Sequence, residues 1–514
     1  MTECFDPLHP GQQFPLTSPI LRNGSQSMMS NPSHLHDDLQ SDKPEEACGV
    51  FGLYAPDEDV AKLTYFGLYA LQHRGQESAG IATFDQDRQV HCHKDMGLVS
   101  RVFNETILQK LPGIMAVGHN RYSTTGSSHV QNAQPALVQT RLGTLTLAHN
   151  GNLVNTRDLR EELERRNCNC VTTSDSEAIA ILIGSEVDAG KDWHQAIASS
   201  LRQCQGAFSL VIGTPIGIFA TRDPHGVRPL VIGNLDTNPN YYVFASETCG
   251  LDIIGASYLR NVNPGELVFA NGDGLSSERW TENPTPKLCV FEMIYFARPD
   301  SMMNEESLYS YRMRIGNVLA EESPVDADLV IGVPDSGIPA AIGYSRTSKI
   351  SYAEGLIKNR YVGRTFIQPT QHMRESGIRM KLNPLKDVLN GQRLIIVDDS
   401  IVRGTTSRKL VKALRDAGAK EVHMRVSSPP VTHPCFYGID TDDQNQLIAA
   451  TKSVDEIAAQ IGVDSLAYLS WEGMLAATEQ DPSQFCSACF TGDYPIPVPT
   501  KLRHSKLMLE ELEV

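Results

Sequence analysis

The sequence lacks the features that would place the chain in or across a membrane. None of its apolar runs approaches the roughly 20 residues that a helix needs to span a bilayer. Residues 1–47 have neither the charged start and apolar core of a secretory signal nor the arginine-rich, acid-poor composition of a transit peptide. We therefore expect a cytoplasmic protein that has no membrane partner.

Positive charge is also scarce. The chain has 514 residues, with 45 lysines and arginines against 61 acidic residues and a formal net charge of −16 at pH 7. This balance argues against nucleic-acid binding, and the sequence has no broadly basic face or helix-turn-helix pattern. Eleven cysteines do not make a disulfide scaffold in a chain this long. They are expected to be free thiols, a nucleophile or metal ligands.

The order of strand and helix patterns predicts two domains of different class. A leader without periodicity covers 1–47, and short apolar strands with a few helices then favour a layered α+β domain over 48–280. Strand–helix alternation predicts an α/β domain with a parallel sheet over 281–495, mainly helical at 453–477, before a tail at 496–514. The expected strands are 116–120, 143–148, 208–213, 217–220, 241–245, 329–334 and 422–426, and the expected helices are 60–71, 156–165, 176–183 and 338–345.

The most informative stretch of the second half runs from Leu394 to Thr406. An apolar, β-branched run ends at Asp398 and Asp399, and a short polar loop then leads into a helical pattern. Strand ends and helix N-termini of this kind bind phosphate, and paired carboxylates suit sugar hydroxyls and Mg²⁺. Taken alone, an acidic pair is also common at strand ends, and the threonines can be a simple helix N-cap.

The whole string resembles the phosphoribosylpyrophosphate (PRPP) loop of type I phosphoribosyltransferases. The turn Val333–Gly337 resembles the pyrophosphate loop of that family, although alone it would be an ordinary proline-glycine turn. The resemblance implies one Mg²⁺ per subunit near Ser336, Asp398 and Asp399. The basic stretch Lys358–Phe366 is similar to the family's flexible loop, a lid over a polyanion, or else it is a solvated charged face. The residues implied to bind PRPP are Ser400, Arg403, Gly404, Thr405, Thr406, Lys358 and Arg360.

Cys48 stands where the leader ends and the ordered pattern begins. If the leader is cut before Cys48, the α-amino group of this residue becomes available as a general base, because its pKa lies near 8. A lone cysteine is as readily a small buried hydrophobe. Four polar strings downstream change this balance: His73–Ser78, Gly118–Thr124, Ala148–Leu153 and Ser174–Glu177.

These strings contain the groups that glutamine hydrolysis needs. Arg121 can hold the substrate carboxylate, Asp175 can accept from its ammonium, and Asn150 with the Gly151 N–H can donate to the oxyanion. Their order and spacing behind Cys48 resemble the glutaminase domain of class II (N-terminal-nucleophile) glutamine amidotransferases, with a layered αββα fold. The resemblance implies that Cys48 is the nucleophile and that Arg74 and Gly75 also shape the glutamine pocket. A structural salt bridge and turn is the alternative for that pair.

Both halves together resemble the amidophosphoribosyltransferase family, over about residues 46–495. The resemblance implies that glutamine is hydrolysed at one site and that the ammonia displaces pyrophosphate from C1 of PRPP at the other. This is the first committed step of purine synthesis. A homotetramer inhibited by purine nucleotides is implied as well. The alternatives are another class II amidotransferase, such as a glucosamine-6-phosphate synthase, and a PRPP-sensing regulator without enzyme activity.

A Cys-x-x-C pair near the end of the fold, together with two distant cysteines, carries a further expectation. Such a pair can bind zinc, cycle as a redox pair or simply pack. Some members of the family hold one [4Fe–4S] cluster per subunit with cysteines in this pattern, which implies a cluster here. The other cysteines, including Cys168 and Cys170, are expected to be structural. The implied ligands are Cys289, Cys435, Cys486 and Cys489.

The leader departs from the family pattern, because it is longer than the propeptide of cluster-bearing relatives. Cleavage before Cys48 is expected from the resemblance alone. A translation start at Met28 or Met29 would shorten the leader.

Overall fold

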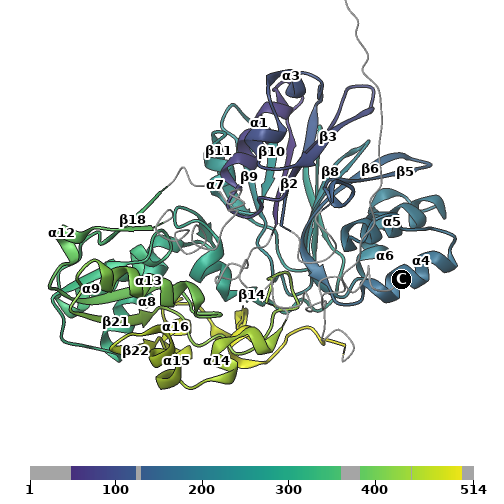
Figure 1. Ribbon diagram of the computed structural model, residues 1–514. Helices are drawn as coiled ribbons and strands as arrows, with labels where there is room; N and C mark the ends of the chain where they lie inside the picture. The colour runs from purple at the N-terminus through teal and green to yellow at the C-terminus, as the bar shows by residue number, and fades with distance from the viewer. Residues whose placement is uncertain (1–47, 123–128, 360–381, 442, 500–514) are drawn as a thin grey trace, which may run out of the picture. The chain divides into compact units, whose positions relative to one another are not determined.

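The computed structural model describes residues 48–122, 129–359, 382–441 and 443–499 (Figure 1). Arg360 and most of the basic stretch predicted as a lid lie outside these ranges. Within them, no helix combines the length and the apolar character that crossing a membrane requires.

Two antiparallel sheets form the first part of the chain. In hydrogen-bonded order, the first contains β11 (Ala256–Asn261), β9 (Val231–Leu235), β10 (Asn238–Ala245), β1 (Gly49–Tyr54), β4 (Met115–Arg121), β2 (Ser78–Phe84) and β3 (Val90–Met96). The second contains β13 (Gly274–Arg279), β12 (Glu266–Asn271), β8 (Gly217–Arg222), β7 (Gly206–Thr214), β6 (Gly143–Leu153) and β5 (Ala136–Thr140). The strands predicted from sequence in this part lie inside β4, β6, β7, β8 and β10.

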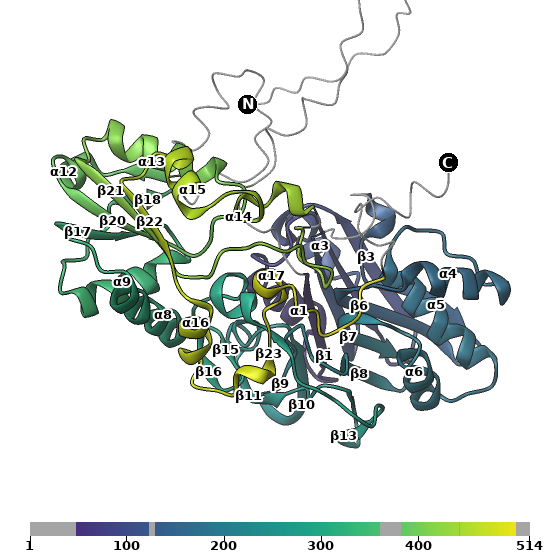
Figure 2. The ribbon, with the colours of Figure 1, turned by 90° about the horizontal axis from the view of Figure 1, so that it is seen from below.

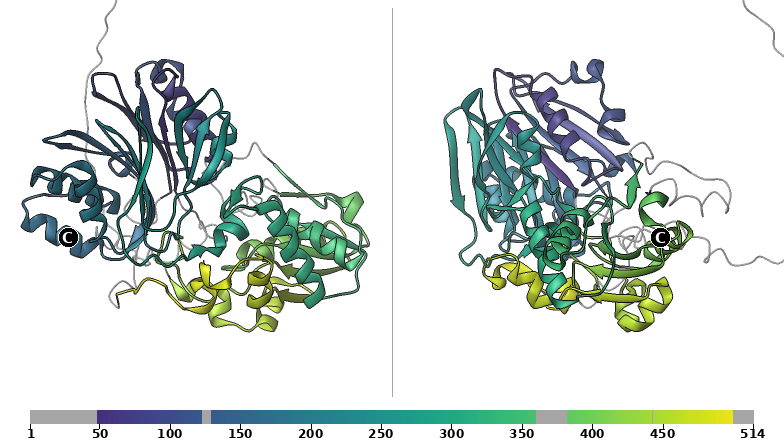
Figure 3. Two further views of the ribbon diagram at one scale, coloured as in Figure 1. Left: turned by 180° about the vertical axis from the view of Figure 1, so that it is seen from behind. Right: turned by 90° about the vertical axis from the view of Figure 1, so that its left-hand side faces the viewer.

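The two sheets face each other and carry helices on their outer faces, as Figures 1 and 3 show. Helix α1 (Val60–Ala70) packs on β1 and β4, and α5 (Asp175–Asp188) packs on β5 and β6. Between the sheets lies a core that includes Val50, Phe84, Val117, Val211 and Phe244. Because both faces of the central strands are covered, β2 and β7 are buried along their whole length. The αββα layering predicted from sequence is confirmed. The other helices of this part are α2 (Val99–Val102), α3 (Glu105–Leu108), α4 (Thr156–Arg165), α6 (Trp193–Leu201) and α7 (Cys249–Asp252).

A four-stranded parallel sheet forms the second part, in the order β17 (Leu329–Gly332), β20 (Arg393–Asp398), β21 (Glu421–Val426) and β22 (Ser465–Tyr468). Figure 2 shows it between α8 (Leu308–Glu322) and α9 (Gly337–Ser348) on one side and α13 (Thr405–Asp416) and α15 (Val454–Ile461) on the other. Parallel neighbours need long crossovers, and helices on both faces supply them. The predicted parallel sheet is therefore confirmed. The shorter elements are β18 (Leu356–Lys358), β19 (Leu382–Pro384), α12 (Lys386–Leu389), α14 (Ile448–Thr451), α16 (Trp471–Ala476) and α17 (Ala488–Thr491).

The sequence prediction for residues 453–477 needs a correction. This segment is not mainly helical throughout, because β22 separates α15 from α16 and pairs in parallel with β21. The four residues of β22 have no strong local strand pattern, and pairing with the edge of β21 decides their conformation. The predicted strand over 329–334 also ends earlier, at Gly332.

Segments distant in sequence join where the two parts meet. Strand β14 (Leu288–Cys289) pairs in parallel with β23 (Phe485–Cys486), so Cys289 lies opposite Cys486. The π-helix η3 (Glu292–Phe296) follows directly. This junction places residues from near the end of the fold against the first residues after the glutaminase-like layers.

The interface between the two sheets allows a stability test at Gly52. A Cβ added there would lie 2.5 Å from Cγ1 of Val211. We therefore expect Gly52→Ala to lower the free energy of unfolding by about 1–3 kcal/mol through overpacking. Thermal melting measures the effect. The Gly52→Ala, Val211→Ala double variant should melt higher than the sum of the two single effects predicts. Simple additivity would contradict this packing.

Candidate functional site

Cys48 directly precedes β1, the central strand of the first sheet, and only 8% of its surface is exposed. Its Sγ lies 3.3 Å from the backbone oxygen of Tyr122, to which the thiol donates, and 3.5 Å from the Tyr122 nitrogen. Tyr122 follows the last residue of β4, which pairs with β1. The pairing of β1 with β4 therefore fixes where the thiol lies.

Burial sets the ionisation of this thiol. Loss of solvent raises the pKa of Cys48 to about 11, although the Tyr122 hydrogen bond and the charge of Arg121 act to lower it. The charges of Glu77 and Asp175 raise it further. The thiol is thus neutral at pH 7 and needs a local base to become a nucleophile.

The side chain of Arg74 holds the backbone of Cys48 in place. Its Nε donates to the Cys48 carbonyl oxygen at 3.1 Å, and Nη1 donates to Glu247 at 2.6 Å. Both terminal nitrogens also donate to Glu292, at 3.0 and 2.7 Å. Arg74 is 1% exposed, and each of its side-chain nitrogens donates to a protein oxygen, one of them on Cys48. At the neighbouring Gly75, a Cβ would lie 2.6 Å from the Asn120 carbonyl, which leaves no room for a side chain.

Asp175 occupies the first turn of α5, behind the N-cap residue Ser174. Its Oδ2 accepts from the Leu153 N–H at 3.1 Å, and its Oδ1 lies 3.5 Å from His149 Nδ1. Burial raises the pKa of this carboxyl, but His149 and the hydrogen bonds outweigh it and lower the pKa. Arg121, at the end of β4, is 3% exposed and lies 3.7 Å from Glu77. An anionic group and a cationic group therefore lie within electrostatic range of the Cys48 thiol.

Asn150 is fully buried on β6, and neither its amide nitrogen nor its amide oxygen has a hydrogen-bond partner within the described ranges. A buried amide without partners costs about 1–3 kcal/mol. Gly151 next to it has a φ of +145°, and a Cβ there would lie 2.0 Å from the Ala207 carbonyl oxygen. This stretch of β6 thus carries a donor that no described residue of the protein uses.

A loop from the second part, residues 435–440, lies against Gly151 and Asn152 of β6. Asn152 donates to the Phe436 carbonyl oxygen at 3.0 Å, and the Tyr122 hydroxyl lies 3.3 Å from Asp440. A Cβ on Gly438 would lie 3.1 Å from the carbonyl carbon of Gly151. Sequence reasoning did not find this loop, because nothing in its local pattern indicates a distant strand as its partner.

The second site lies at the carboxyl ends of β17 and β20. Asp398 is the last residue of β20 and Asp399 follows it, and both are at most 2% exposed. The Asp399 carboxylate accepts hydrogen bonds from the hydroxyls of Ser336 and, at 2.6 Å, Ser400. The backbone N–H of Asp399 donates to Asp398 at 2.9 Å. The three residues predicted near Mg²⁺ are therefore brought together by two neighbouring parallel strands.

The loop after β20 leads into the N-terminus of α13. Gly404, with a φ of +79°, precedes α13, and Thr405 and Thr406 are the first residues of that helix. Backbone N–H groups at such a helix start favour an anion. Lys358 reaches the pyrophosphate-loop turn and pairs with Asp335 at 2.5 Å, whereas Arg403 donates to Gln446 at 3.0 Å. Arg360 lies outside the described ranges.

The four cysteines predicted as cluster ligands gather at the junction of the two parts. Cys289 and Cys486 are partners in the β14–β23 pair, and charge interactions couple each of the four to the others. None of the ten described cysteines forms a disulfide. Burial raises the pKa of Cys289 to about 11 and that of Cys486 to about 12, while the nearby Arg228 acts to lower both.

Within the described ranges, no three His, Cys, Asp or Glu side chains converge closely enough to hold a single metal ion. A zinc ion needs its sulfur ligands about 2.3 Å from one centre. A cluster distributes its ligands over several iron atoms. Of the four thiols here, Cys289 and Cys486 are buried, and Cys435 and Cys489 are partly exposed.

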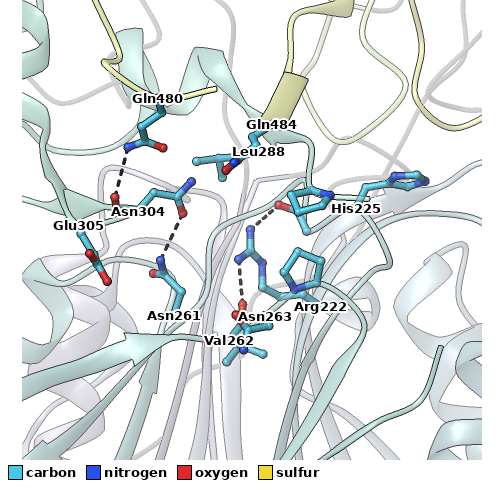
Figure 4. Close-up of a pocket in the computed structure, with 13 residues that line it drawn as sticks. Arg222, His225, Asn261, Val262, Asn263, Leu288, Asn304, Glu305, Gln480 and Gln484 are labelled. Atoms are coloured by element: carbon cyan, nitrogen blue, oxygen red, sulfur yellow. Dashed lines mark hydrogen bonds between the residues drawn. The ribbon is translucent and has the colours of Figure 1, made fainter. Parts of the chain in front are cut away.

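A cavity of about 290 Å³ contains none of the predicted site residues (Figure 4). Its Arg222 donates to the carbonyl oxygens of Gly226, Arg228 and Val262. Asn261 and Gln480 both donate to Asn304, at 3.2 Å each. Because each side-chain nitrogen of Arg222 already donates to a backbone oxygen, this residue links segments of the fold. We assign the cavity no role in the chemistry.

The folds and sites described above define a glutamine amidotransferase joined to a phosphoribosyltransferase. A family model for a glutamine amidotransferase domain matches residues 119–252, and one for a phosphoribosyl transferase domain matches residues 315–429. An amidophosphoribosyltransferase of Synechocystis sp. is 72% identical over 92% of this chain and 95% of its own. The corresponding Mycobacterium tuberculosis protein is 52% identical over 92% of this chain and 91% of its own.

A solved structure gives the same result. The glutamine PRPP amidotransferase of B. subtilis, complexed with ADP and GMP, has a TM-score of 0.83 and 47% identity, covering 88% of this chain and 98% of its own. The chain therefore belongs to the amidophosphoribosyltransferase family. This confirms the predicted family and the predicted reaction, glutamine-dependent amino transfer to PRPP in purine biosynthesis. It excludes the sugar-phosphate synthase and the non-enzymatic regulator as alternatives.

The raised pKa of Cys48 predicts how its reactivity depends on pH. In the chain that retains its leader, alkylation of Cys48 by iodoacetamide should accelerate about tenfold per pH unit between pH 7 and 10, because only the thiolate reacts. Mass spectrometry of the peptide that contains Cys48 measures the rate. A free thiol in the same tube should level off above its pKa of about 8.5. The same plateau at Cys48 would contradict the burial argument.

Proposed function

We propose that the two sites divide the reaction between Cys48 and the acidic pair of β20. The observation that carries the first assignment is the fully buried amide of Asn150, which has no hydrogen-bond partner among the described residues. Leaving such a donor without a partner is costly unless a substrate atom engages it. Its place next to Gly151, on the strand whose Leu153 binds Asp175, makes the carbonyl oxygen of glutamine the natural acceptor.

In the glutaminase step, the Arg121 guanidinium binds the α-carboxylate of glutamine and Asp175 accepts from its α-ammonium. Removal of residues 1–47 exposes the α-amine of Cys48, whose pKa near 8 allows it to accept the thiol proton at neutral pH. The thiolate attacks the amide carbon, and the oxyanion receives hydrogen bonds from Asn150 Nδ2 and the Gly151 N–H. The proton returns to the leaving nitrogen, ammonia departs, and water releases glutamate from the thioester.

Arg74 and Gly75 support this step by positioning the backbone around Cys48. The guanidinium fixes the Cys48 carbonyl, and the small Gly75 lets the chain pass beside Asn120. We therefore assign Arg74 as a positioning residue rather than a glutamine ligand.

In the transfer step, ammonia attacks C1 of PRPP and the C1–oxygen bond to pyrophosphate breaks. We infer that Ser400, Arg403, Gly404, Thr405 and Thr406 bind the 5-phosphate and that the acidic pair orients the ribose. Lys358 stands at the pyrophosphate end and pairs with Asp335. Mg²⁺ held by Ser336, Asp398 and Asp399 would neutralise charge that develops on the pyrophosphate. Arg360 and the rest of the predicted lid belong to the same proposal.

Several further assignments are part of this proposal. They are a boundary near residue 280 between a glutaminase and a transferase domain, a homotetramer, purine nucleotides as inhibitors and a cytoplasmic location. The nucleotide assignment is supported by the ADP and GMP bound in the B. subtilis relative. A [4Fe–4S] cluster on Cys289, Cys435, Cys486 and Cys489 would cross-link β14, β23 and the loop at 435–440.

Replacement of Cys48 distinguishes the activity of one proposed site from that of the other. We expect Cys48→Ala to abolish glutamine-dependent phosphoribosylamine synthesis, because no thioester can form, while synthesis from ammonium salts persists at a rate close to that of the unaltered enzyme. An anaerobic assay with PRPP, Mg²⁺ and either nitrogen source measures both rates. Equal loss of both activities would contradict the division of labour between the sites.

The proposed cluster predicts the iron and sulfide content of the protein. Protein purified without oxygen should contain about four iron atoms and four acid-labile sulfides per chain, and Cys489→Ser should lose most of both. Elemental analysis and visible absorption measure this, and Cys168→Ser is the control that should retain the iron. Zinc without iron would overturn the cluster assignment.

A further inference from the structure

The oxyanion stretch of β6 is held between two other segments. On one side, β7 leaves no space above Gly151, because a Cβ there would lie 2.0 Å from the Ala207 carbonyl oxygen. On the other side, the loop at 435–440 packs against the Gly151 backbone. A Cβ on Gly438 would lie 3.1 Å from the Gly151 carbonyl carbon and 3.2 Å from both its Cα and its oxygen. The peptide unit next to the proposed oxyanion donors is therefore confined from both faces.

The loop that makes this contact is itself firmly held. Asn152 donates to the Phe436 carbonyl oxygen at 3.0 Å, and the buried Arg228 donates to the Tyr437 carbonyl oxygen at 2.9 Å. The Tyr437 hydroxyl donates to the carbonyl oxygen of Ile496 at 2.6 Å and accepts from its N–H at 3.0 Å. These four hydrogen bonds come from three separate regions of the sequence. They fix the two residues that directly precede Gly438.

We propose that Gly438 is a positioning residue for the oxyanion hole, and this inference rests on the proposed roles of Asn150 and Gly151. Its φ of +104° and the short distances to Gly151 mean that only glycine lets the loop approach this closely. The close approach holds the Gly151 backbone, and with it the direction of the oxyanion donors. Gly438 touches neither substrate nor nucleophile, so it acts through the geometry of β6 alone.

The consequence for catalysis is specific. Donors of an oxyanion hole act on the tetrahedral intermediate far more strongly than on bound glutamine. A displaced Gly151 peptide therefore lowers kcat for glutamine hydrolysis and leaves ground-state binding at Arg121 and Asp175 intact. A general loss of folding would instead lower both, together with the ammonia-dependent reaction of the second site.

The test compares Gly438→Ala with Gly190→Ala in the complete, cluster-containing enzyme. Gly190 has a φ of +109°, close to that of Gly438, but no atom of the described residues lies within 4 Å of an added Cβ. Both variants carry the same backbone strain, and only the first pushes on Gly151. Glutamate formation is measured with PRPP and Mg²⁺ present, and ammonia-dependent synthesis is measured in the same preparation.

For Gly438→Ala we expect glutaminase kcat to fall by roughly 100-fold, with KM for glutamine and ammonia-dependent synthesis close to those of the unaltered enzyme. Binding gives a second readout. The aldehyde analogue of glutamine forms a tetrahedral adduct with the thiol, so its affinity should fall by a similar factor, whereas the affinity of glutamate should not. Gly190→Ala should match the unaltered enzyme in every readout.

Unchanged kcat and aldehyde affinity in Gly438→Ala would overturn the inference, as would a parallel loss in Gly190→Ala. If Gly438→Ala does not fold, Asn152→Ala replaces it, because it removes the Phe436 bond without adding a Cβ. That variant should lower aldehyde affinity but not glutamate affinity, and equal effects on both would count against the inference.

Asn150→Ala separates this inference from the proposed function. If Asn150→Ala leaves kcat intact, the oxyanion assignment itself fails. If Asn150→Ala lowers kcat and Gly438→Ala does not, only the role of Gly438 fails.

Discussion

The position of Cys48 depends on a buried charge network centred on Arg74. This side chain joins the Cys48 carbonyl oxygen to Glu247 in the first part of the chain and to Glu292 at the start of the second. All three charged groups are at most 1% exposed, and Arg228 adds a second cation to Glu292 at 3.0 Å. In such a setting, removing one partner leaves a buried charge uncompensated, at a cost of about 3–5 kcal/mol. The network therefore admits little variation in where Cys48 lies.

The same network ties the glutaminase site to the cysteine site. Glu292 follows Cys289 by three residues, and Arg228 donates both to Glu292 and to the Tyr437 carbonyl oxygen. Tyr437 follows Cys435 by two residues, and its N–H lies 3.4 Å from the Cys435 sulfur. Cys289 is thus close in sequence to Glu292, which binds the arginine that holds Cys48. Cys435 is next to Phe436, which binds Asn152 on β6. A group that binds these cysteines would stiffen both contacts at once.

Local patterns explain which features the sequence could predict. The string from Leu394 to Thr406 encodes its own strand, loop and helix start, so the acidic pair and the phosphate loop are predictable from sequence alone. Cys48, Asn150 and Asp175 could be selected as candidate site residues from sequence because they stand in or ahead of dense polar strings. Strand β22 was missed because its edge pairing with β21 decides it, and Glu292 and Gly438 were missed because a lone glutamate or glycine gives no sign of distant partners. Their roles depend on tertiary contacts, which no spacing rule encodes.

One property of the glutaminase site has two opposite effects. Exclusion of water would make the Asn150 amide, which has no partner among the described residues, a strong donor to the proposed oxyanion, since little solvent competes with it. The same exclusion raises the pKa of the Cys48 thiol to about 11, which leaves almost no thiolate at pH 7. A distant base could not resolve this conflict without adding another buried charge to a site that already holds Arg121, Glu77 and Asp175. An α-amine on Cys48 itself can, because it is neutral above a pKa near 8 and lies on the residue that it activates. The desolvation that strengthens the oxyanion hole is therefore a physical reason for the proposed removal of the leader.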